Sequence, residues 1–217
     1  GARISGINTT TLEIAGVDKL SGTEHTIIPD RIETGTFLIA AAATRGNVTL
    51  TRTQPQQLET VLSKLTDIGM KITLTKDTVN IRYLTPLRPV DIETVPYPGF
   101  PTDLQSLWTA LMCTIPGRSI IRETIFENRF LHVGELRRMG AQIEVQGNTA
   151  VIDGIKYLSG APVSATDLRA AAALVIAGLA ARGKTVVSGL HHLDRGYENF
   201  SRKLRRLGAN IRRIVAQ

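Results

Sequence analysis

The chain has 217 residues, of which 42% are hydrophobic and 21% charged, so it is long enough to bury a sizeable core and disorder is not expected. A formal net charge of +7 suits anionic partners such as phosphorylated metabolites, nucleic acid or acidic membranes. The single cysteine excludes an internal disulfide framework and is typical of a reducing compartment, so we expect a cytoplasmic protein without a signal peptide or membrane span.

A motif of the form Gly-x-x-Ile recurs through the chain at intervals of roughly 69 residues, which indicates a repeat architecture. Its copies are Gly1-Ala-Arg-Ile4, Gly69-Met-Lys-Ile72, Gly140-Ala-Gln-Ile143 and Gly208-Ala-Asn-Ile211. The last three copies follow apolar residues at helical spacing, which predicts amphipathic helices over about 58–68, 126–136 and 197–207. The glycine then ends each helix.

Pairs of short strands are expected after these glycines. Alternating β-branched residues around a polar turn predict hairpins over 72–81 and 143–152, and residues 1–16 show the same pattern. We therefore expect residues 1–22 to be the closing hairpin of a preceding repeat or of another domain. A further strand is expected after Gly22, because the string 17–22 resembles the string 155–160 two periods later.

Three other stretches are apolar on all sides, and this pattern predicts helices that are buried all round. They span residues 34–46, 101–113 and 164–183, and short strands follow them at 48–50, 119–121 and 185–187. Asp167 and Arg169 lie in the first turn of the third stretch, so it is a core helix and not a membrane span. One unit therefore reads strand, buried helix, strand, amphipathic helix, strand, strand.

Residues 23–217 are expected to form one domain of three such units, at about 23–84, 88–154 and 158–217. The predicted fold class is α/β, an inside-out α/β barrel of three βαβαββ repeats with buried helices and outer sheets, because no unit can bury its apolar helix alone. Unit three ends after Ile214-Val215 without its last strand, so we expect the chain to be the C-terminal part of a longer protein. Either residues 11–16 complete unit three or its edge stays open.

The N-termini of the buried helices are expected to converge at one end of the domain, where free N–H groups and helix dipoles attract anions. Asp103, Asp167 and Arg169 lie at that end. Arg129 and Arg195 occupy the same turn of units two and three, before the amphipathic helix. Because guanidinium groups bind carboxylate and phosphate through paired hydrogen bonds, these residues predict a site for a small molecule that bears both groups.

Structural interpretations of the same residues remain open. The two aspartates are suitable helix N-caps, and the arginines of units two and three can pair with the adjacent acids Glu127 and Asp194. Arg169 is harder to explain in this way, because it interrupts an apolar helix. We expect Cys113 to be an inert core thiol, and His191-His192 lack the further ligands of a metal site. The basic tail lacks the aromatic residues of a nucleic-acid platform, so we expect no nucleic-acid partner.

Several strings resemble the C-terminal half of the UDP-N-acetylglucosamine enolpyruvyl transferases, and the match runs in order across essentially the whole chain. They are Pro29-Asp-Arg-Ile-Glu-Thr-Gly-Thr-Phe37, Phe100-Pro-Thr-Asp-Leu-Gln105, Glu123-Thr-Ile-Phe-Glu-Asn-Arg-Phe130, Leu158-Ser-Gly-Ala161, Ala165-Thr-Asp-Leu-Arg-Ala170 and His192-Leu-Asp-Arg-Gly-Tyr-Glu198. The related shikimate 3-phosphate enolpyruvyl transferases share the fold, but we expect Asp-His-Arg in them where this chain has Asp167-Leu-Arg169.

The resemblance implies two similar inside-out α/β domains with an active site in the cleft between them. It implies a transferase that moves the enolpyruvyl group of phosphoenolpyruvate onto the 3-hydroxyl of UDP-N-acetylglucosamine and releases phosphate, by addition and then elimination. No metal or organic cofactor is expected. The implied role is in peptidoglycan precursor synthesis, and hence in cell wall biogenesis, cell shape and cell division.

By motif match, the resemblance also implies roles for individual residues. Asp103 corresponds to the general base beside the sugar 3-hydroxyl, Asp167 orients groups or relays protons, and the backbone at Ile125 touches the UDP-sugar. Phosphoenolpyruvate is then bound by three arginines, Arg129 and Arg169 at its carboxylate end and Arg195 at the departing phosphate.

This chain lacks several parts of the family pattern. The Pro-Gly-Gly-Cys loop with the reactive cysteine, the N-terminal lysine-asparagine pair and the uridine-contacting segments are absent, and Cys113 lies in the wrong element to replace that cysteine. We therefore expect the missing N-terminal domain to be a partner and the chain alone to be inactive. Two other readings remain: a shikimate 3-phosphate enolpyruvyl transferase, or a non-catalytic binding module on the same repeat fold, whose nucleic-acid binding would weaken steeply with salt.

Overall fold

A computed structural model describes residues 1–7 and 9–214. Its α-helices are α1 (Arg31–Ala43), α2 (Glu59–Asp67), α3 (Gln105–Met112), α4 (Val133–Arg138), α5 (Leu168–Ala180) and α6 (Phe200–Arg206). Short 3₁₀ helices are η1 (Pro55–Leu58), η2 (Thr102–Leu104) and η3 (Leu193–Arg195). The strands are β1 (Arg3–Ser5), β2 (Glu13–Ala15), β3 (Asn47–Thr51), β4 (Lys71–Leu74), β5 (Thr78–Arg82), β6 (Ile92–Glu93), β7 (Gly117–Arg122), β8 (Gln142–Gln146), β9 (Thr149–Gly154), β10 (Pro162–Ser164) and β11 (Val186–Ser188).

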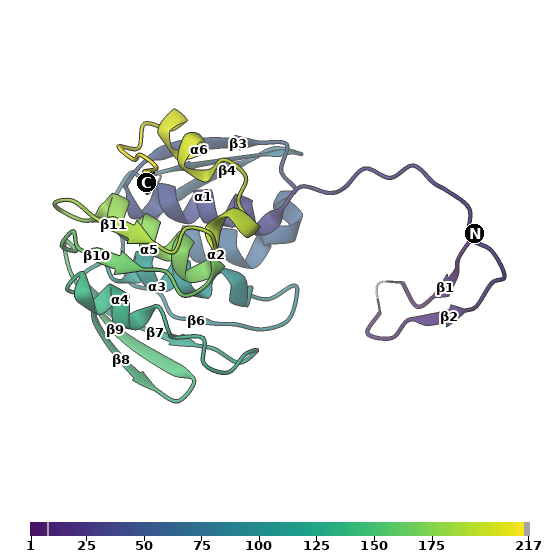
Figure 1. The fold of residues 1–217 in the computed structure, drawn as a ribbon, viewed down its shortest axis with the longest axis horizontal. Coiled ribbons are helices and arrows are strands. Elements are labelled where there is room, and N and C mark those ends of the chain that lie inside the picture. Colours follow the sequence, from purple (N-terminus) through teal and green to yellow (C-terminus); the bar gives the residue numbers. More distant parts are fainter. Residues whose placement is uncertain (8, 215–217) are drawn as a thin grey trace.

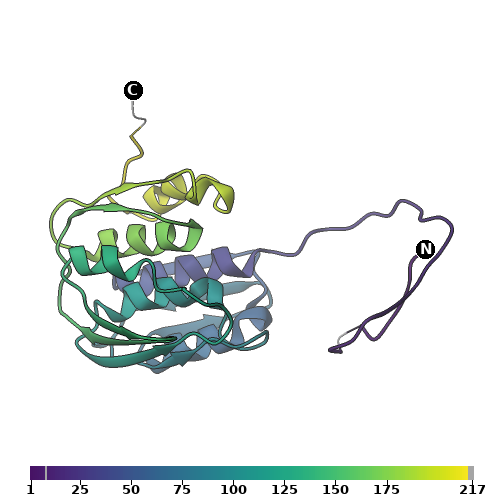
Figure 2. The ribbon, with the colours of Figure 1, turned by 60° about the horizontal axis from the view of Figure 1, so that its bottom comes forward.

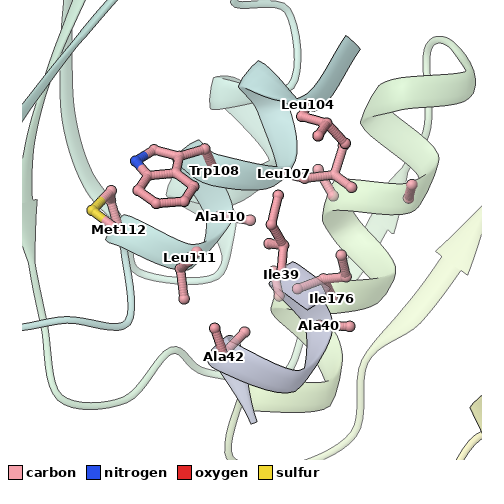
Figure 3. Packing of buried hydrophobic residues seen from close by; sticks show 14 of the residues in the cluster. Ile39, Ala40, Ala42, Leu104, Leu107, Trp108, Ala110, Leu111, Met112 and Ile176 are labelled. Carbon is pink, nitrogen blue, oxygen red and sulfur yellow. The ribbon is translucent and has the colours of Figure 1, made fainter. Parts of the chain in front are cut away.

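Helices α1, α3 and α5 form the centre of the molecule, and each contacts the other two. Every residue of α3 is buried, as are residues 34–43 of α1 and 170–177 of α5. Figure 3 shows Ile39, Leu107, Leu111 and Ile176 meeting where the three helices pack. The strands and the amphipathic helices lie around this core (Figures 1 and 2). The prediction of buried helices inside and sheets outside is therefore confirmed.

Helices α1 and α3 run in the same direction, as contacts at both ends show, and the Arg169–Asp103 contact places the start of α5 beside the start of α3. At the N-terminal end, Gly35 of α1 lies so close to Leu104 that an added Cβ would sit 2.4 Å from its Cδ1 atom. At the other end the Arg45 guanidinium donates to the Ala43 carbonyl, at 2.6 Å, and to the carbonyl of Thr114, at 2.5 Å. Arg45 therefore joins the C-terminal ends of α1 and α3, where a cation is favourable.

The sheets of the three units share one pattern but differ in their number of strands. In the middle unit β6, β7, β9 and β8 lie in that order, with β6 parallel to β7 and the other pairs antiparallel. The first unit has the order β3-β5-β4, and the described part of the third unit, up to residue 214, has the parallel pair β10-β11. The predicted hairpins are confirmed as β4-β5, β8-β9 and β1-β2.

Two strand predictions are wrong. The strand expected after Gly22 does not form, because residues 23–28 are exposed and lead away from the body without a partner strand (Figure 1). Residues 209–214 form no strand either, and Val215 lies outside the described residues. The β1-β2 hairpin pairs with itself and lies apart from β10 and β11, so it does not complete the third unit (Figures 1 and 2).

The amphipathic helix predicted over 126–136 is shorter than expected. It begins only at Val133, and Asn128 before it has φ of 56°, a left-handed conformation that interrupts a helix. The other two amphipathic helices form as α2 and α6, close to their predicted bounds. Over residues 1–7 and 9–214, none of the helices has both the length and the apolar character that crossing a membrane requires.

Candidate functional site at the N-termini of the core helices

The first turn of α5 carries a charged pair at the start of an apolar helix. Asp167 is the N-cap, and its Oδ1 atom accepts hydrogen bonds from the backbone N–H groups of Arg169, at 2.8 Å, and Ala170, at 3.2 Å. Burial alone raises the pKa of Asp167, but these hydrogen bonds and the nearby Arg169 charge outweigh burial and bring the pKa below its usual value. The capping interpretation of Asp167 is therefore confirmed, and its carboxyl is ionised at neutral pH.

Asp103 joins the three elements that meet at this end. It lies in η2, directly before α3, and its Oδ1 atom is 2.5 Å from Nε of Arg169 on α5. The same oxygen is 3.8 Å from Nη1 of Arg129, which lies on the loop before α4. Neither η2 nor α3 has a side-chain N-cap, so the capping interpretation of Asp103 is wrong. The predicted convergence of Asp103, Arg129, Asp167 and Arg169 is confirmed.

Arg129 is more enclosed than Asp103 or Arg169, with a side chain only 14% exposed. Burial lowers the pKa of its guanidinium, as does the Arg169 charge, while Asp103, Glu123 and Asp167 oppose this shift. Arginine nevertheless stays charged in proteins. Its pairing partner is Asp103, so the expected pair with Glu127 is wrong. Two guanidinium groups therefore flank one carboxylate here, which leaves cationic capacity for an anionic ligand.

A cavity of about 200 Å³ opens beside this cluster. Its lining comes from α3, the loop before α4 and the start of α5: Gln105, Ser106, Glu127, Asn128, Arg129, Leu131, His132, Asp167, Arg169 and Ala170. Three buried atoms of this lining have no hydrogen-bond partner, namely Gln105 Nε2, Ser106 Oγ and His132 Nε2. Because buried polar groups are normally paired, three such atoms around one cavity indicate a place that receives a polar ligand or water.

The His132 imidazole is held neutral. It is 3% exposed, and burial lowers its pKa to about 4, although the Asp167 charge and the Arg129 backbone favour the protonated ring. At neutral pH the ring therefore adds a polar but uncharged group to the cavity.

Three predicted site residues lie outside this lining: Asp103, which borders it through Arg129 and Arg169, and Arg195 and Ile125. Arg195 ends η3, which packs beside the start of α5 because Gly196 meets Leu168, but the Arg195 side chain is exposed. Its neighbour Asp194 pairs with Arg213 at 2.5 Å, so the expected Arg195–Asp194 pair is wrong. Ile125 is half-buried on the loop after β7, and its backbone N–H donates to Glu123.

Two further predictions concern Cys113 and a metal site. Cys113 is buried, and burial raises its pKa to about 12, which confirms an inert core thiol. Across residues 1–7 and 9–214, no group of three or more His, Cys, Asp or Glu side chains is arranged to hold a metal ion.

Four residues of this region were not predicted from the sequence: Gln105, Ser106, Glu123 and His132. Gln105 and Ser106 are polar residues at the start of a fully buried helix, and that contrast is a signal in the sequence. Glu123 continues the inward face of β7 two residues after Ile121, so its alternation places an acid in the core. Nothing in the local sequence identifies His132, because its burial depends on how the loop before α4 folds.

Comparisons with known proteins agree with this architecture. The chain is 54% identical over 214 residues to UDP-N-acetylglucosamine 1-carboxyvinyltransferase of Endomicrobium trichonymphae, covering 99% of this chain and 51% of that protein. It is 50% identical over 217 residues to the protein of the same name from Xylella fastidiosa (strain 9a5c), with 99% and 51% covered. The chain thus spans about half the length of the curated relatives that it matches.

Solved structures show the same fold. The enolpyruvyl transferase NikO from Streptomyces tendae superposes with a TM-score of 0.82 at 31% identity, over 98% of this chain and 51% of that one. EPSP synthase from Acinetobacter baumannii superposes with a TM-score of 0.72 at 16% identity, over 95% and 51%. The family model of EPSP synthase (3-phosphoshikimate 1-carboxyvinyltransferase) matches residues 1–204. The chain therefore belongs to the EPSP synthase (3-phosphoshikimate 1-carboxyvinyltransferase) family.

Proposed function

We propose that this chain forms part of an enolpyruvyl transferase that acts on phosphoenolpyruvate and UDP-N-acetylglucosamine. The observation that carries the proposal is the cluster of Asp103, Arg129 and Arg169 at the N-termini of α3 and α5. It places a carboxylate that can accept a proton beside two guanidinium groups that can bind a carboxylate or phosphate. Relatives at 50–54% identity are named UDP-N-acetylglucosamine 1-carboxyvinyltransferase, which favours the UDP-sugar as acceptor.

The proposed reaction uses these groups in order. Asp103 accepts the proton of the sugar 3-hydroxyl as the hydroxyl oxygen forms a bond to C2 of phosphoenolpyruvate, the C2–C3 double bond opens and C3 takes up a proton from water. Arg129 and Arg169 bind the phosphoenolpyruvate carboxylate and hold C2 facing that oxygen. The bond between C2 and the phosphate oxygen then breaks as C3 returns a proton to water, which restores the double bond and releases phosphate. Asp167, ionised and adjacent to Arg169, orients this arginine or relays the proton.

Two further roles belong to the same proposal. The backbone at Ile125 contacts the UDP-sugar, and Arg195 binds the departing phosphate when the full site is assembled. Arg195 is exposed beside the start of α5, which leaves its side chain free to reach a ligand there. We propose that the other half of the relatives' length supplies the facing wall of the site, including the reactive cysteine loop. The expected setting is cytoplasmic synthesis of peptidoglycan precursors.

The alternative acceptor is shikimate 3-phosphate, which the name of the matching family model favours. Leu168 stands between Asp167 and Arg169, where we expect a histidine in that group of enzymes. An apolar side chain at this position is a second reason, beside the names of the relatives, for ranking the UDP-sugar first.

The deciding experiment measures phosphate release from phosphoenolpyruvate by the product of the uninterrupted reading frame that encodes this chain. It is run with UDP-N-acetylglucosamine and, separately, with shikimate 3-phosphate. We expect release only with the UDP-sugar, and a loss of about 10²–10⁴-fold in kcat for Asp103→Ala, the usual range for a general base.

Three outcomes would change the proposal. Release only with shikimate 3-phosphate would exchange the acceptor. Release with neither acceptor would leave a binding module on this fold. Turnover by the 217-residue chain alone would contradict the proposed need for a facing wall.

A further inference from the structure

Glu123 is an acid in the core of the middle unit. It follows β7 at a position that points inward, and it is only 2% exposed. Its two carboxylate oxygens accept four hydrogen bonds. Oε1 accepts from the hydroxyl of Thr94 at 2.8 Å and from the backbone N–H groups of Ile125 at 2.9 Å and Phe126 at 3.1 Å. Oε2 accepts from the hydroxyl of Thr102 at 2.9 Å.

The two oxygens lead to different parts of the proposed site. Thr102 is the first residue of η2 and directly precedes Asp103, so the Oε2 bond restrains the turn that carries the proposed base. The Oε1 bonds restrain the loop that carries Ile125 and Phe126. The ring of Phe126 lies 4.3 Å from the Arg129 guanidinium, so this loop also adjoins the proposed phosphoenolpyruvate ligand.

Thr94 closes the network on its far side. Its hydroxyl accepts from the backbone N–H of Thr124 at 2.9 Å and donates to Glu123, while the Thr124 hydroxyl donates to the Thr94 carbonyl. The donors around the carboxylate are thus themselves held in place. A fully paired buried network of this kind fixes one geometry, because any rearrangement leaves a polar group without a partner.

We propose that Glu123 is the positioning residue for the acceptor side of the site, setting Asp103 through Thr102 and the Ile125 backbone through its own loop. This inference rests on the proposed function. This role is more than structural, because each carboxylate oxygen of Glu123 holds a different segment of the proposed site. Oε2 holds the turn that carries Asp103, and Oε1 holds the loop that carries Ile125. The two segments can therefore be followed by separate measurements.

Thr102→Val removes the hydroxyl that reaches Oε2 and leaves the Ile125 side intact. A misplacement of the base of about 1 Å can cost on the order of 10²-fold in rate, so we expect kcat to fall by at least about tenfold while the KM for UDP-N-acetylglucosamine changes little. Thr102→Ser keeps the hydroxyl and should restore kcat. The control is Thr66→Val, which deletes the hydroxyl of an exposed threonine on α2 that donates to the Leu62 carbonyl.

Glu123→Ala tests the other side without any need for activity. In the 217-residue chain we expect hydrogen exchange of the Ile125 and Phe126 amides to speed up by at least about tenfold, because burial of an unpaired N–H is unfavourable and the loop opens. Amides of the β7-β9 ladder should keep their protection, which also shows that the variant is folded. Glu123→Gln retains a carbonyl oxygen for the same two amides and should exchange like wild type.

The outcomes separate this inference from the proposed function. If the wild-type enzyme releases no phosphate with the UDP-sugar, the proposed function fails, and the exchange experiment still tests the loop. If the wild-type enzyme is active and Thr102→Val behaves like Thr66→Val, Glu123 does not position Asp103. Unchanged exchange of Ile125 and Phe126 in folded Glu123→Ala would overturn the inference for the loop.

Discussion

The first turns of α1 and α5 are capped alike, but the ion pairs behind their caps differ. Asp30 caps α1 through the backbone N–H groups of Ile32 and Glu33, as Asp167 caps α5. Behind the cap, α1 has Glu33, which pairs with Lys203 at 2.6 Å. In α5, Arg169 lies one position nearer the cap and pairs with Asp103 in the candidate site. The same kind of helix start therefore carries a structural ion pair in one repeat and contributes to the candidate site in the other.

The buried polar groups near the two helices differ in the same way. Beside α1, the hydroxyls of Thr36 and Tyr197 are 2.7 Å apart and satisfy one another, and burial raises the pKa of Tyr197 to about 12. Beside α3 and α5, Gln105, Ser106 and His132 each keep an unpaired buried atom. Of the five unpaired buried side-chain atoms in the described part of the chain, these three lie where a ligand is expected, and such departures are typical of functional sites.

The largest difference between the two helix ends should appear when Arg129 is replaced by alanine. Truncating one partner of a buried charge pair typically costs about 2–5 kcal/mol, so Arg129→Ala should lower kcat/KM for phosphoenolpyruvate by more than about 30-fold. Steady-state kinetics of the full reading-frame product measures this loss. Calorimetry should show little change in the binding of UDP-N-acetylglucosamine. Equal losses for both ligands would count against the assigned role. The control Lys203→Ala, at the α1 end, should stay within about twofold of wild type.

The second test concerns stability at acid pH. An unfolded histidine binds a proton below pH 6.5, its ordinary pKa, whereas His132 in the folded chain does so only near pH 4. The unfolded state therefore binds more protons between these values, so stability is full above about pH 6.5 and falls as the pH approaches 4. This pKa difference lowers the free energy of unfolding by roughly 3 kcal/mol at most as the pH falls from 6.5 to 4.

Urea unfolding from pH 4 to 7.5 measures this effect. The difference in unfolding free energy between wild type and His132→Gln should grow in favour of wild type as the pH rises. The control His25→Gln removes a histidine from the exposed segment before α1 and should leave the pH profile parallel to that of wild type. A parallel profile for His132→Gln would mean that the imidazole is not held neutral.

A third test uses the matched caps of α1 and α5. Asp30→Ala and Asp167→Ala should each lower the unfolding free energy by about 1 kcal/mol, because each removes an N-cap. Asp30→Asn and Asp167→Asn keep the cap and should be close to wild type in stability. Only Asp167→Asn should reduce turnover, since only its charge adjoins Arg169. Similar activity of the two asparagine variants would remove Asp167 from the mechanism.

The smallest expected effect concerns the Glu33–Lys203 pair. Its side chains are 27% and 37% exposed, so Glu33→Gln should cost less than about 1 kcal/mol. Thermal unfolding at low salt measures this difference, which should shrink as the ionic strength rises to 1 M. A larger, salt-independent loss would mean that the α1 end is as tightly coupled electrostatically as the site.

Most of the architecture follows from local patterns in the sequence. All-round apolarity located α1, α3 and α5, and their shared direction brought Asp103 and Asp167 to one end, since the repeat places each helix alike. Alternation located the β4-β5 and β8-β9 hairpins, because each strand pairs with its neighbour in sequence. These features need no knowledge of distant segments.

The features that were predicted wrongly or not at all depend on contacts between segments distant in the sequence. A strand after Gly22 requires a partner beside β3, and the chain leads away there instead. The loop before α4 departs from a helix at Asn128, which local apolar spacing did not reveal. The network around Glu123 joins residues from 94 to 126, so its donors could not be assigned before the middle unit was folded.

The segment between the β1-β2 hairpin and α1 has a practical consequence for proteolysis. Residues 18–28 are exposed and form neither helix nor strand, and they include Lys19. Proteases cut most readily where the backbone is exposed and not held in a ladder. Brief treatment with trypsin should therefore cleave after Lys19 and release the hairpin, while Asp30 and the α1 cap stay with the body. The trimmed product offers a compact sample for the exchange measurements on Ile125 and Phe126.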